Sequence, residues 1–215
     1  MTGTQFTIDG VTKYYPGANC YWCSFLANTA DVDLVLGHVK TSGLKILRTW
    51  GFNDVNIVPQ CDNWFRHMTA SSSTINTGVN GLGRLDTVVA SAEKNRTRLI
   101  INFGRLRRDQ GIHTPALFGG DHNGWYTNTA TQTQYRRYIN AVVGRYKNSN
   151  SIFAWELPKE SRCQGCATSI IYNWAKSTSE YIKSLDPKHL VTLGDEGTEL
   201  PGDITYPYQY GEGRH

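Results

Sequence analysis

The sequence predicts an α/β fold built around a parallel sheet, and it favours a (β/α)8 barrel. Five short apolar runs alternate with four stretches of helical periodicity. The runs are apolar enough to be covered on both faces, as strands of a parallel sheet are. Polar side chains follow several runs, where a barrel places its active site. They are Arg48, Asn102, Glu160 and Asp195-Glu196.

The N-terminal segment is expected to form a β-hairpin. Thr4–Ile8 and Val11–Tyr15 have the composition of strands and flank the turn residues Asp9-Gly10. This hairpin leads into a short strand at Asn19–Tyr21. A first helix is then expected to have Asp31 as its N-cap and to stop at Gly43.

The strand–helix unit then recurs along the chain. Each helix is marked by an apolar stripe, and one of them begins with a capping-box pattern at Thr129–Gln132. The remaining expected elements, in order, are the strand 44–50, a helix over 82–92, the strand 98–103, a helix from 129 to 146, the strand 151–156, a helix over 170–185 and the strand 190–193.

This alternation would also suit a doubly wound sheet. A nucleotide-binding sheet of that type carries Gly-x-Gly-x-x-Gly after its first strand, and no such motif follows here. A barrel typically needs about 250 residues, whereas the 215-residue sequence supplies five strands. We therefore expect residues 1–215 to form the N-terminal part of a single barrel, covering roughly its first five βα units.

Composition excludes several classes of protein. Aromatic residues make up 12% and charged residues 19% of the chain, which excludes intrinsic disorder. No apolar run approaches the roughly 18 residues of a membrane span. The net charge of +4 is spread along the chain except at Arg105, Arg107 and Arg108. Neither a nucleic-acid nor a membrane partner is expected.

Cysteine spacing favours local disulfides. Four cysteines form the pairs Cys20/Cys23 and Cys163/Cys166, and Cys61 is left over. A zinc ribbon would separate its pairs by about 15–20 residues, and two thioredoxin-like pairs in one chain would be unusual, although both alternatives stay open. Disulfides and the sequon Asn95-Arg96-Thr97 indicate a secreted, extracellular protein whose signal peptide is not present in this chain.

The stretch Trp155–Cys163 carries the clearest chemical signal. Glu160 follows a strand and lies near aromatic residues in the sequence. Glycoside hydrolysis needs one carboxyl group that protonates the leaving oxygen and a second that attacks the anomeric carbon or activates water. From spacing alone, a solvated loop glutamate is the competing interpretation.

Longer motifs favour the chemical interpretation, because the chain resembles the fungal endo-β-1,4-mannanases of glycoside hydrolase family 5 from about residue 3 to 213. The motifs that carry this resemblance are Thr4–Gly10, Gly17–Phe25, Arg48–Asp54, Gly119-Gly120, Trp125–Asn128, Phe153–Leu157 and Leu193–Gly197.

The resemblance implies retaining hydrolysis of internal β-1,4 linkages in mannan, galactomannan or glucomannan, without a metal or an organic cofactor. Glu160 matches the acid/base, and Arg48 matches an arginine that orders the nucleophile. Arg162 matches a residue of the leaving-group side, and Glu196 matches a position in the cleft. The resemblance also implies that the paired cysteines form disulfides.

Two departures from the family bear on catalysis. Lys159 replaces an asparagine that binds the sugar 2-hydroxyl; an ammonium group cannot accept a hydrogen bond, and its charge favours the ionised form of Glu160. Arg105–Arg108 replaces sugar-contacting residues, which indicates a solvated basic loop or, as the alternative, a route to an acidic polymer.

The resemblance places the nucleophile on a later strand than this sequence contains. We therefore expect turnover by residues 1–215 to be impaired or absent unless Glu196, Glu212 or a partner chain supplies a carboxylate. Open sheet edges would favour self-association. The alternatives are a β-1,4-glucanase of the same family, or a non-catalytic protein that stacks sugars on Trp22, Trp50 and Trp125.

Overall fold

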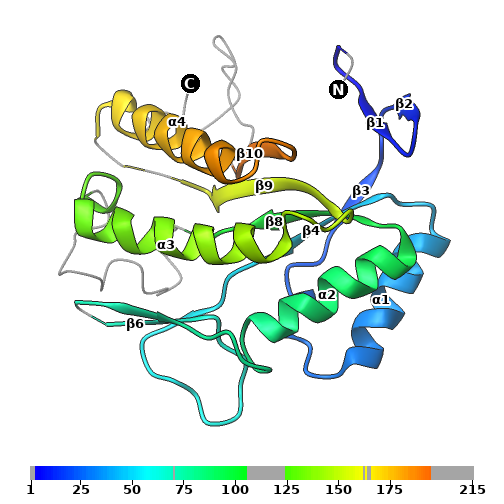
Figure 1. Cartoon of the computed structure of the whole chain (residues 1–215), viewed down its shortest axis with the longest axis horizontal. Helices are drawn as coiled ribbons and strands as arrows, with labels where there is room; N and C mark the ends of the chain where they lie inside the picture. The colour runs from blue at the N-terminus through cyan, green and yellow to red at the C-terminus, as the bar shows by residue number, and fades with distance from the viewer. Residues whose placement is uncertain (1–2, 70, 106–123, 162, 164–165, 195–215) are drawn as a thin grey trace, which may run out of the picture.

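A five-stranded parallel sheet forms the centre of the molecule (Figure 1). The computed structural model describes residues 3–69, 71–105, 124–161, 163 and 166–194. The strands lie side by side in the order in which they occur in the chain, and every neighbouring pair is parallel. They are β3 (Gly17–Asn19), β4 (Ile46–Trp50), β8 (Arg98–Asn102), β9 (Ile152–Lys159) and β10 (Leu190–Gly194).

Four α-helices in the described part of the chain cover the sheet and bury the apolar stripes that the sequence shows. α1 packs against α2, and α3 packs against α4. Within these stripes Leu85, Tyr138 and Ile182 are fully buried, and burying such a side chain stabilises the fold by about 1.5–3 kcal/mol. The alternation of strands and helices is thus confirmed. The helices are α1 (Thr29–Thr41), α2 (Leu82–Asn95), α3 (Thr129–Tyr146) and α4 (Thr168–Leu185).

Both predicted helix caps are wrong by a short distance. α1 begins after Asn28, whose side chain accepts a hydrogen bond from the backbone of Ala30, so Asp31 lies in the first turn. There the negative charge of its carboxylate interacts favourably with the positive N-terminal end of the helix dipole. α3 begins after Asn128 in the same way, and not with a capping box over Thr129–Gln132. An asparagine is the N-cap of both helices, because its side-chain oxygen accepts a hydrogen bond from a backbone N–H that has no partner within the helix.

The predicted hairpin is confirmed by the antiparallel strands β1 (Phe6–Ile8) and β2 (Val11–Lys13). A second small sheet was not predicted. It contains β5 (Asp54–Val55), β6 (Arg66–Met68) and β7 (Ser73–Ile75), and a buried ion pair between Arg66 and Asp54 at 2.5 Å joins two of its strands. Two short 3-10 helices complete the described elements, η1 (Cys23–Phe25) and η4 (Gly124–Tyr126).

The cysteines pair locally, as the preferred interpretation predicted. Cys20 is bonded to Cys23, and Cys163 is bonded to Cys166, while Cys61 is a free, exposed thiol. The zinc and redox alternatives are therefore not supported. None of the helices in the described residues has the length and apolar character needed to cross a membrane.

Candidate active site

A row of side chains crosses the sheet near the carboxyl ends of three strands. Trp50 of β4 is in register with Asn102 of β8, which is in register with Glu156 of β9. The carboxyl ends of the strands form the edge at which barrels place their functional groups. Strand pairing thus brings together residues that lie up to 106 positions apart in the sequence (156 − 50).

Glu156 is a buried carboxylate with a full set of partners. It is 3% exposed, and Arg48 donates to both of its oxygens, from Nε to Oε2 at 2.7 Å and from Nη2 to Oε1 at 2.5 Å. Asn102 Nδ2 donates to Oε1 at 2.6 Å and to the Leu157 carbonyl at 2.7 Å. A bidentate arginine and an amide stabilise a charge that would otherwise be costly to bury.

Glu160 lies one residue beyond the end of β9. Its backbone has a φ of 55°, in the left-handed region that few non-glycine residues adopt. The backbone N–H donates to the carbonyl of Gly194 at 2.9 Å, which fixes the chain at the end of β10. Observed backbone strain of this kind clusters at functional sites, so the conformation supports a functional interpretation of Glu160.

Two cations flank the Glu160 carboxylate. Arg105 Nη2 lies 3.7 Å from Oε2, and Lys159 Nζ lies 3.7 Å from Oε1. The side chains of Glu160 and Lys159 are each 16% exposed. Both cations therefore lie within ion-pair distance of the Glu160 carboxylate.

Lys159 also covers an aromatic ring. Its Nζ lies 4.5 Å from the centroid of Trp50, a cation–π contact. Trp50 in turn stacks on Phe52, with ring centroids 4.8 Å apart, and contacts Tyr21 at 4.8 Å. The ammonium group therefore lies over part of the surface that the sequence offered as a platform for sugar stacking.

The Lys159 ammonium lies in a field that opposes its charge. Burial lowers the pKa of Lys159 below its usual value, and the nearby guanidinium groups of Arg105 and Arg48 lower it further. The Glu160 carboxylate acts in the opposite direction without reversing the shift.

Gly194 lets β10 approach β9 closely at this point. A Cβ at position 194 would lie 2.6 Å from the Cα of Lys159 and 2.8 Å from Oε1 of Glu156. Any side chain would therefore push apart the two strands that position the carboxylates.

Four of the predicted site residues meet at this edge: Arg48, Trp50, Lys159 and Glu160. Arg162 and Glu196 lie outside the described residues, as do Arg107, Arg108 and Glu212.

Sequence reasoning missed the part that Glu156 plays. The available signal was a charged residue at the end of the apolar strand expected over 151–156, which needs a partner of opposite charge if it is buried.

Trp125 does not serve as a platform for sugars. It is 3% exposed and packs between Tyr126, Tyr135 and Trp174 in the core. Trp22, by contrast, is 41% exposed, on the turn closed by the Cys20–Cys23 disulfide. The sequence interpretation of Trp125 is wrong because two of its aromatic neighbours, Tyr135 and Trp174, come from α3 and α4, which no local pattern reveals.

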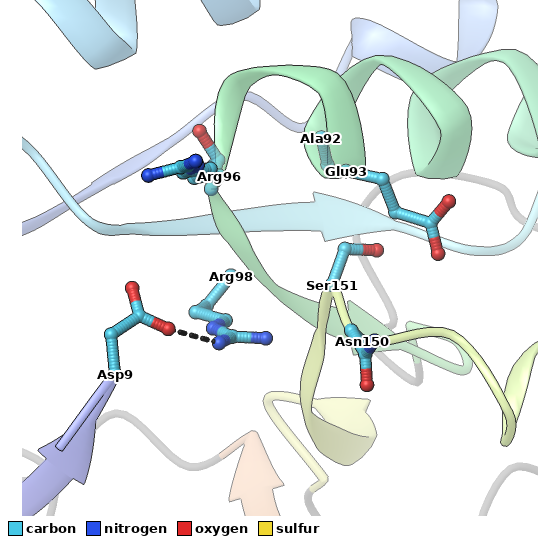
Figure 2. Close-up of a pocket in the computed structure, with 8 residues that line it drawn as sticks. Asp9, Ala92, Glu93, Arg96, Arg98, Asn150 and Ser151 are labelled. Atoms are coloured by element: carbon cyan, nitrogen blue, oxygen red, sulfur yellow. Dashed lines mark hydrogen bonds and ion pairs between the residues drawn. The ribbon is translucent and has the colours of Figure 1, made fainter.

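A separate cavity of about 440 Å³ lies at the opposite end of the strands (Figure 2). It is polar, and within it Asp9 of the hairpin turn accepts a hydrogen bond from Arg98 at 2.6 Å. Arg96, Asn150 and Ser151 lie around the same space. This end of a barrel usually serves stability rather than catalysis, so the carboxyl-end cluster is the candidate active site.

A run of βα units with carboxylates at the carboxyl edge of a parallel sheet is the architecture of the (β/α)8 glycoside hydrolases. A family model described as GH family 5 beta-mannosidase-like matches residues 113–205. Mannan endo-1,4-beta-mannosidase A of Hypocrea jecorina is 57% identical over 99% of this chain and 50% of that relative. The protein of the same name from Podospora anserina is 56% identical, over 99% of this chain and 58% of its own length.

Among solved structures, an endo-1,4-beta-mannanase from Rhizomucor miehei superposes with a TM-score of 0.88 at 33% identity. The match covers 99% of this chain and 65% of that one. The chain is therefore similar in sequence and fold to proteins of glycoside hydrolase family 5. It spans about half the length of the curated relatives it matches.

Proposed function

We propose that this chain is the N-terminal part of the catalytic barrel of a secreted endo-β-1,4-mannanase, with Glu160 as its general acid/base. One structural observation carries the proposal: Glu160 has a left-handed backbone at the carboxyl edge of the sheet, and its carboxylate lies between Arg105 and Lys159. The close relatives named as mannan endo-1,4-beta-mannosidases support the choice of substrate.

In this proposal Glu160 acts in both halves of a retaining hydrolysis. It gives its proton to the glycosidic oxygen as the bond from that oxygen to the anomeric carbon breaks, while a second carboxylate attacks that carbon. It then takes a proton from the water that hydrolyses the glycosyl-enzyme. Lys159 and Arg105 would stabilise the carboxylate that remains after the first proton transfer.

Glu156 is not suited to be the second carboxylate. Both of its oxygens accept charge-assisted hydrogen bonds from Arg48, and the side chain is buried. A carboxylate held in this way cannot reach a sugar ring without breaking both contacts. We propose that Glu156 positions Arg48, which would orient a nucleophile contributed by a later strand of the barrel.

The test is the release of reducing sugar from galactomannan by the protein and by its Glu160→Gln variant. Loss of a positioned acid/base is expected to lower kcat by about 10²–10⁴-fold. Glu180→Gln is the matched control, because Glu180 is exposed on α4, away from the site. Full activity in the Glu160 variant would exclude the proposed role.

A second candidate function is mannan binding without hydrolysis. The exposed ring of Trp22, on the turn closed by the Cys20–Cys23 disulfide, favours it, because an exposed aromatic face can stack on a sugar ring. This function would be supported if the protein bound mannan in a pull-down assay while neither it nor its Glu160→Gln variant released reducing sugar.

A further inference from the structure

The sequon Asn95-Arg96-Thr97 lies where a helix gives way to a strand. Asn95 is the last residue of α2, and Arg96, with a φ of 55°, ends the helix. Thr97 then leads into β8, and its backbone N–H donates to the Ala92 carbonyl at 2.9 Å. No other Asn-x-Ser/Thr triplet occurs in the sequence. Such triplets accept N-linked glycans on surface segments of secreted proteins.

The Asn95 amide is placed to carry a bulky group. Its side chain is partly exposed, and its chain neighbours Lys94 and Arg96 are exposed. Among the described residues, Nδ2 donates one hydrogen bond, to the Ser91 carbonyl at 2.9 Å. An amide nitrogen has two N–H groups. A glycan that replaces one of them leaves the other, so the contact with Ser91 at the end of α2 can be kept.

Thr97 supplies a hydroxyl without a structural partner in the part of the chain that the structure describes. The residue is 1% exposed, and its Oγ1 makes no hydrogen bond there. A buried hydroxyl left unpaired costs about 1–3 kcal/mol, so the folded state gains nothing from this group. A role before folding accounts for it, since the sequon requires Ser or Thr at this position.

The sequon lies at the opposite end of the sheet from Glu160. β8 begins at Arg98, next to the sequon, and ends at Asn102 in the candidate active site. These two residues lie about 13 Å apart at the usual rise of a strand. Arg96 also lines the polar cavity at the amino ends of the strands (Figure 2). A glycan on Asn95 would therefore leave the carboxyl edge open to a polysaccharide.

We propose that Asn95 is an N-glycosylation site that is modified before α2 and β8 fold. The inference rests on the proposed function in one respect, because it requires a secreted protein. A bond forms between Asn95 Nδ2 and the anomeric carbon of an oligosaccharide, and the bond from that carbon to a phosphate oxygen of its lipid diphosphate carrier breaks. Nδ2 loses one proton, and the lipid diphosphate is the leaving group. The step precedes folding because the folded chain buries the Thr97 hydroxyl.

The test is expression in yeast behind a secretory leader, followed by peptide mass analysis of the secreted protein before and after treatment with a peptide N-glycanase. This enzyme removes the glycan and converts the asparagine that carried it into aspartate. Asn95 is expected to be converted. A secreted protein in which Asn95 carries no glycan would overturn the proposal.

The order of events has its own test. Solubilised oligosaccharyltransferase and its lipid-linked donor are incubated with folded, unglycosylated protein from bacteria or with a synthetic peptide of residues 88–101. The peptide is expected to be modified and the folded protein to stay unmodified. Modification of the folded protein, or none of the peptide, would overturn the proposal.

Three variants and a control sharpen the test. Asn95→Gln and Thr97→Val are expected to lose the glycan, whereas Thr97→Ser is expected to keep it. Thr97→Val removes no hydrogen bond of the described fold, so its melting temperature should not fall and the loss of the glycan cannot be attributed to misfolding. Asn148→Gln is the matched control, because Asn148 is exposed and its neighbour Ser149 has the wrong spacing for a sequon. A glycan that persists in Thr97→Val would overturn the proposal.

The outcomes separate this inference from the proposed function. Glu160-dependent hydrolysis of mannan by a secreted protein without a glycan on Asn95 would overturn the inference and leave the function standing. A glycan on Asn95 of a protein that neither binds nor cleaves mannan would support the inference and count against the function.

Discussion

Arg48 and Glu156 form a bidentate ion pair between two strands that are not neighbours. Arg48 lies on β4 and Glu156 on β9, with β8 between them, and Asn102 of β8 donates to the same carboxylate. Three consecutive strands are therefore joined by side chains as well as by backbone hydrogen bonds. This hydrogen-bonded cluster lies at the edge of the sheet where β9 leads into Glu160.

Glu156→Gln is expected to destabilise the fold by about 3–5 kcal/mol, because Arg48 loses the buried partner of its charge. The measurement is the free energy of unfolding in urea. Asp86→Asn is the control. Asp86 pairs with Arg145 in the same bidentate way, but the side chains of Arg145 and Asp86 are 35% and 42% exposed. That change is expected to cost less than about 1 kcal/mol. Equal losses in the two variants would contradict the argument.

Trp22 and Trp125 are expected to respond in opposite ways to substitution. Trp125→Ala empties a packed core position and should cost about 3–5 kcal/mol of stability. Trp22→Ala removes an exposed ring, so it should leave the melting temperature nearly unchanged and weaken the binding of mannan. Thermal melts and binding isotherms of the two variants test this contrast. A Trp22 variant with unaltered mannan affinity would remove that residue from the site.

Lys159→Asn is expected to raise the rate on neutral mannan. The change removes a positive charge 3.7 Å from Glu160 and supplies an amide that can accept as well as donate hydrogen bonds. The new amide could then bind a sugar hydroxyl that the ammonium cannot accept from, and this contact should strengthen in the transition state. Rates of reducing-sugar release from mannan by the two proteins measure this. Equal rates would show that Lys159 does not hinder hydrolysis.

Asp186 is expected to make folding sensitive to acid. It is 2% exposed, and burial alone would raise its pKa. Hydrogen bonds from His189 at 2.6 Å and Trp155 at 2.8 Å outweigh burial and lower the pKa from 3.8 to about 2. The carboxylate therefore stabilises the fold fully above pH 3.8, by about 2 kcal/mol, and this contribution disappears as pH falls to about 2.

Unfolding free energies measured over this pH range test the assignment to Asp186. Asp186→Asn should flatten the acid limb, whereas Asp31→Asn on the exposed first turn of α1 should leave it steep. If both variants kept the same slope, the acid sensitivity would have to come from another group.

The regular part of the fold could be predicted because its signals are local. Apolar stripes such as that of α2 and short apolar strands such as β8 are visible within about ten residues of sequence. The small sheet β5–β7 was missed because its strands have two or three residues and Asp54 and Arg66 are charged. These charges are buried only because they pair across two strands, and a local pattern does not contain that information.

The site was predictable to the same extent. Glu160 and Arg48 stand at strand ends, where position in the sequence translates directly into position on the sheet. The cation–π contact between Lys159 and Trp50 and the left-handed backbone of Glu160 depend on how β4, β9 and β10 meet. Such relationships arise from tertiary packing and need coordinates.

The order of the strands in the sheet also has a consequence for how the chain reaches its native state. β3, β4, β8, β9 and β10 lie in the order in which a ribosome makes them, so each new strand joins the free side of the strand made before it. A nascent chain can therefore extend its sheet one βα unit at a time without waiting for a distant segment. Because synthesis delivers the N-terminal strands first, this order lets the sheet form during synthesis.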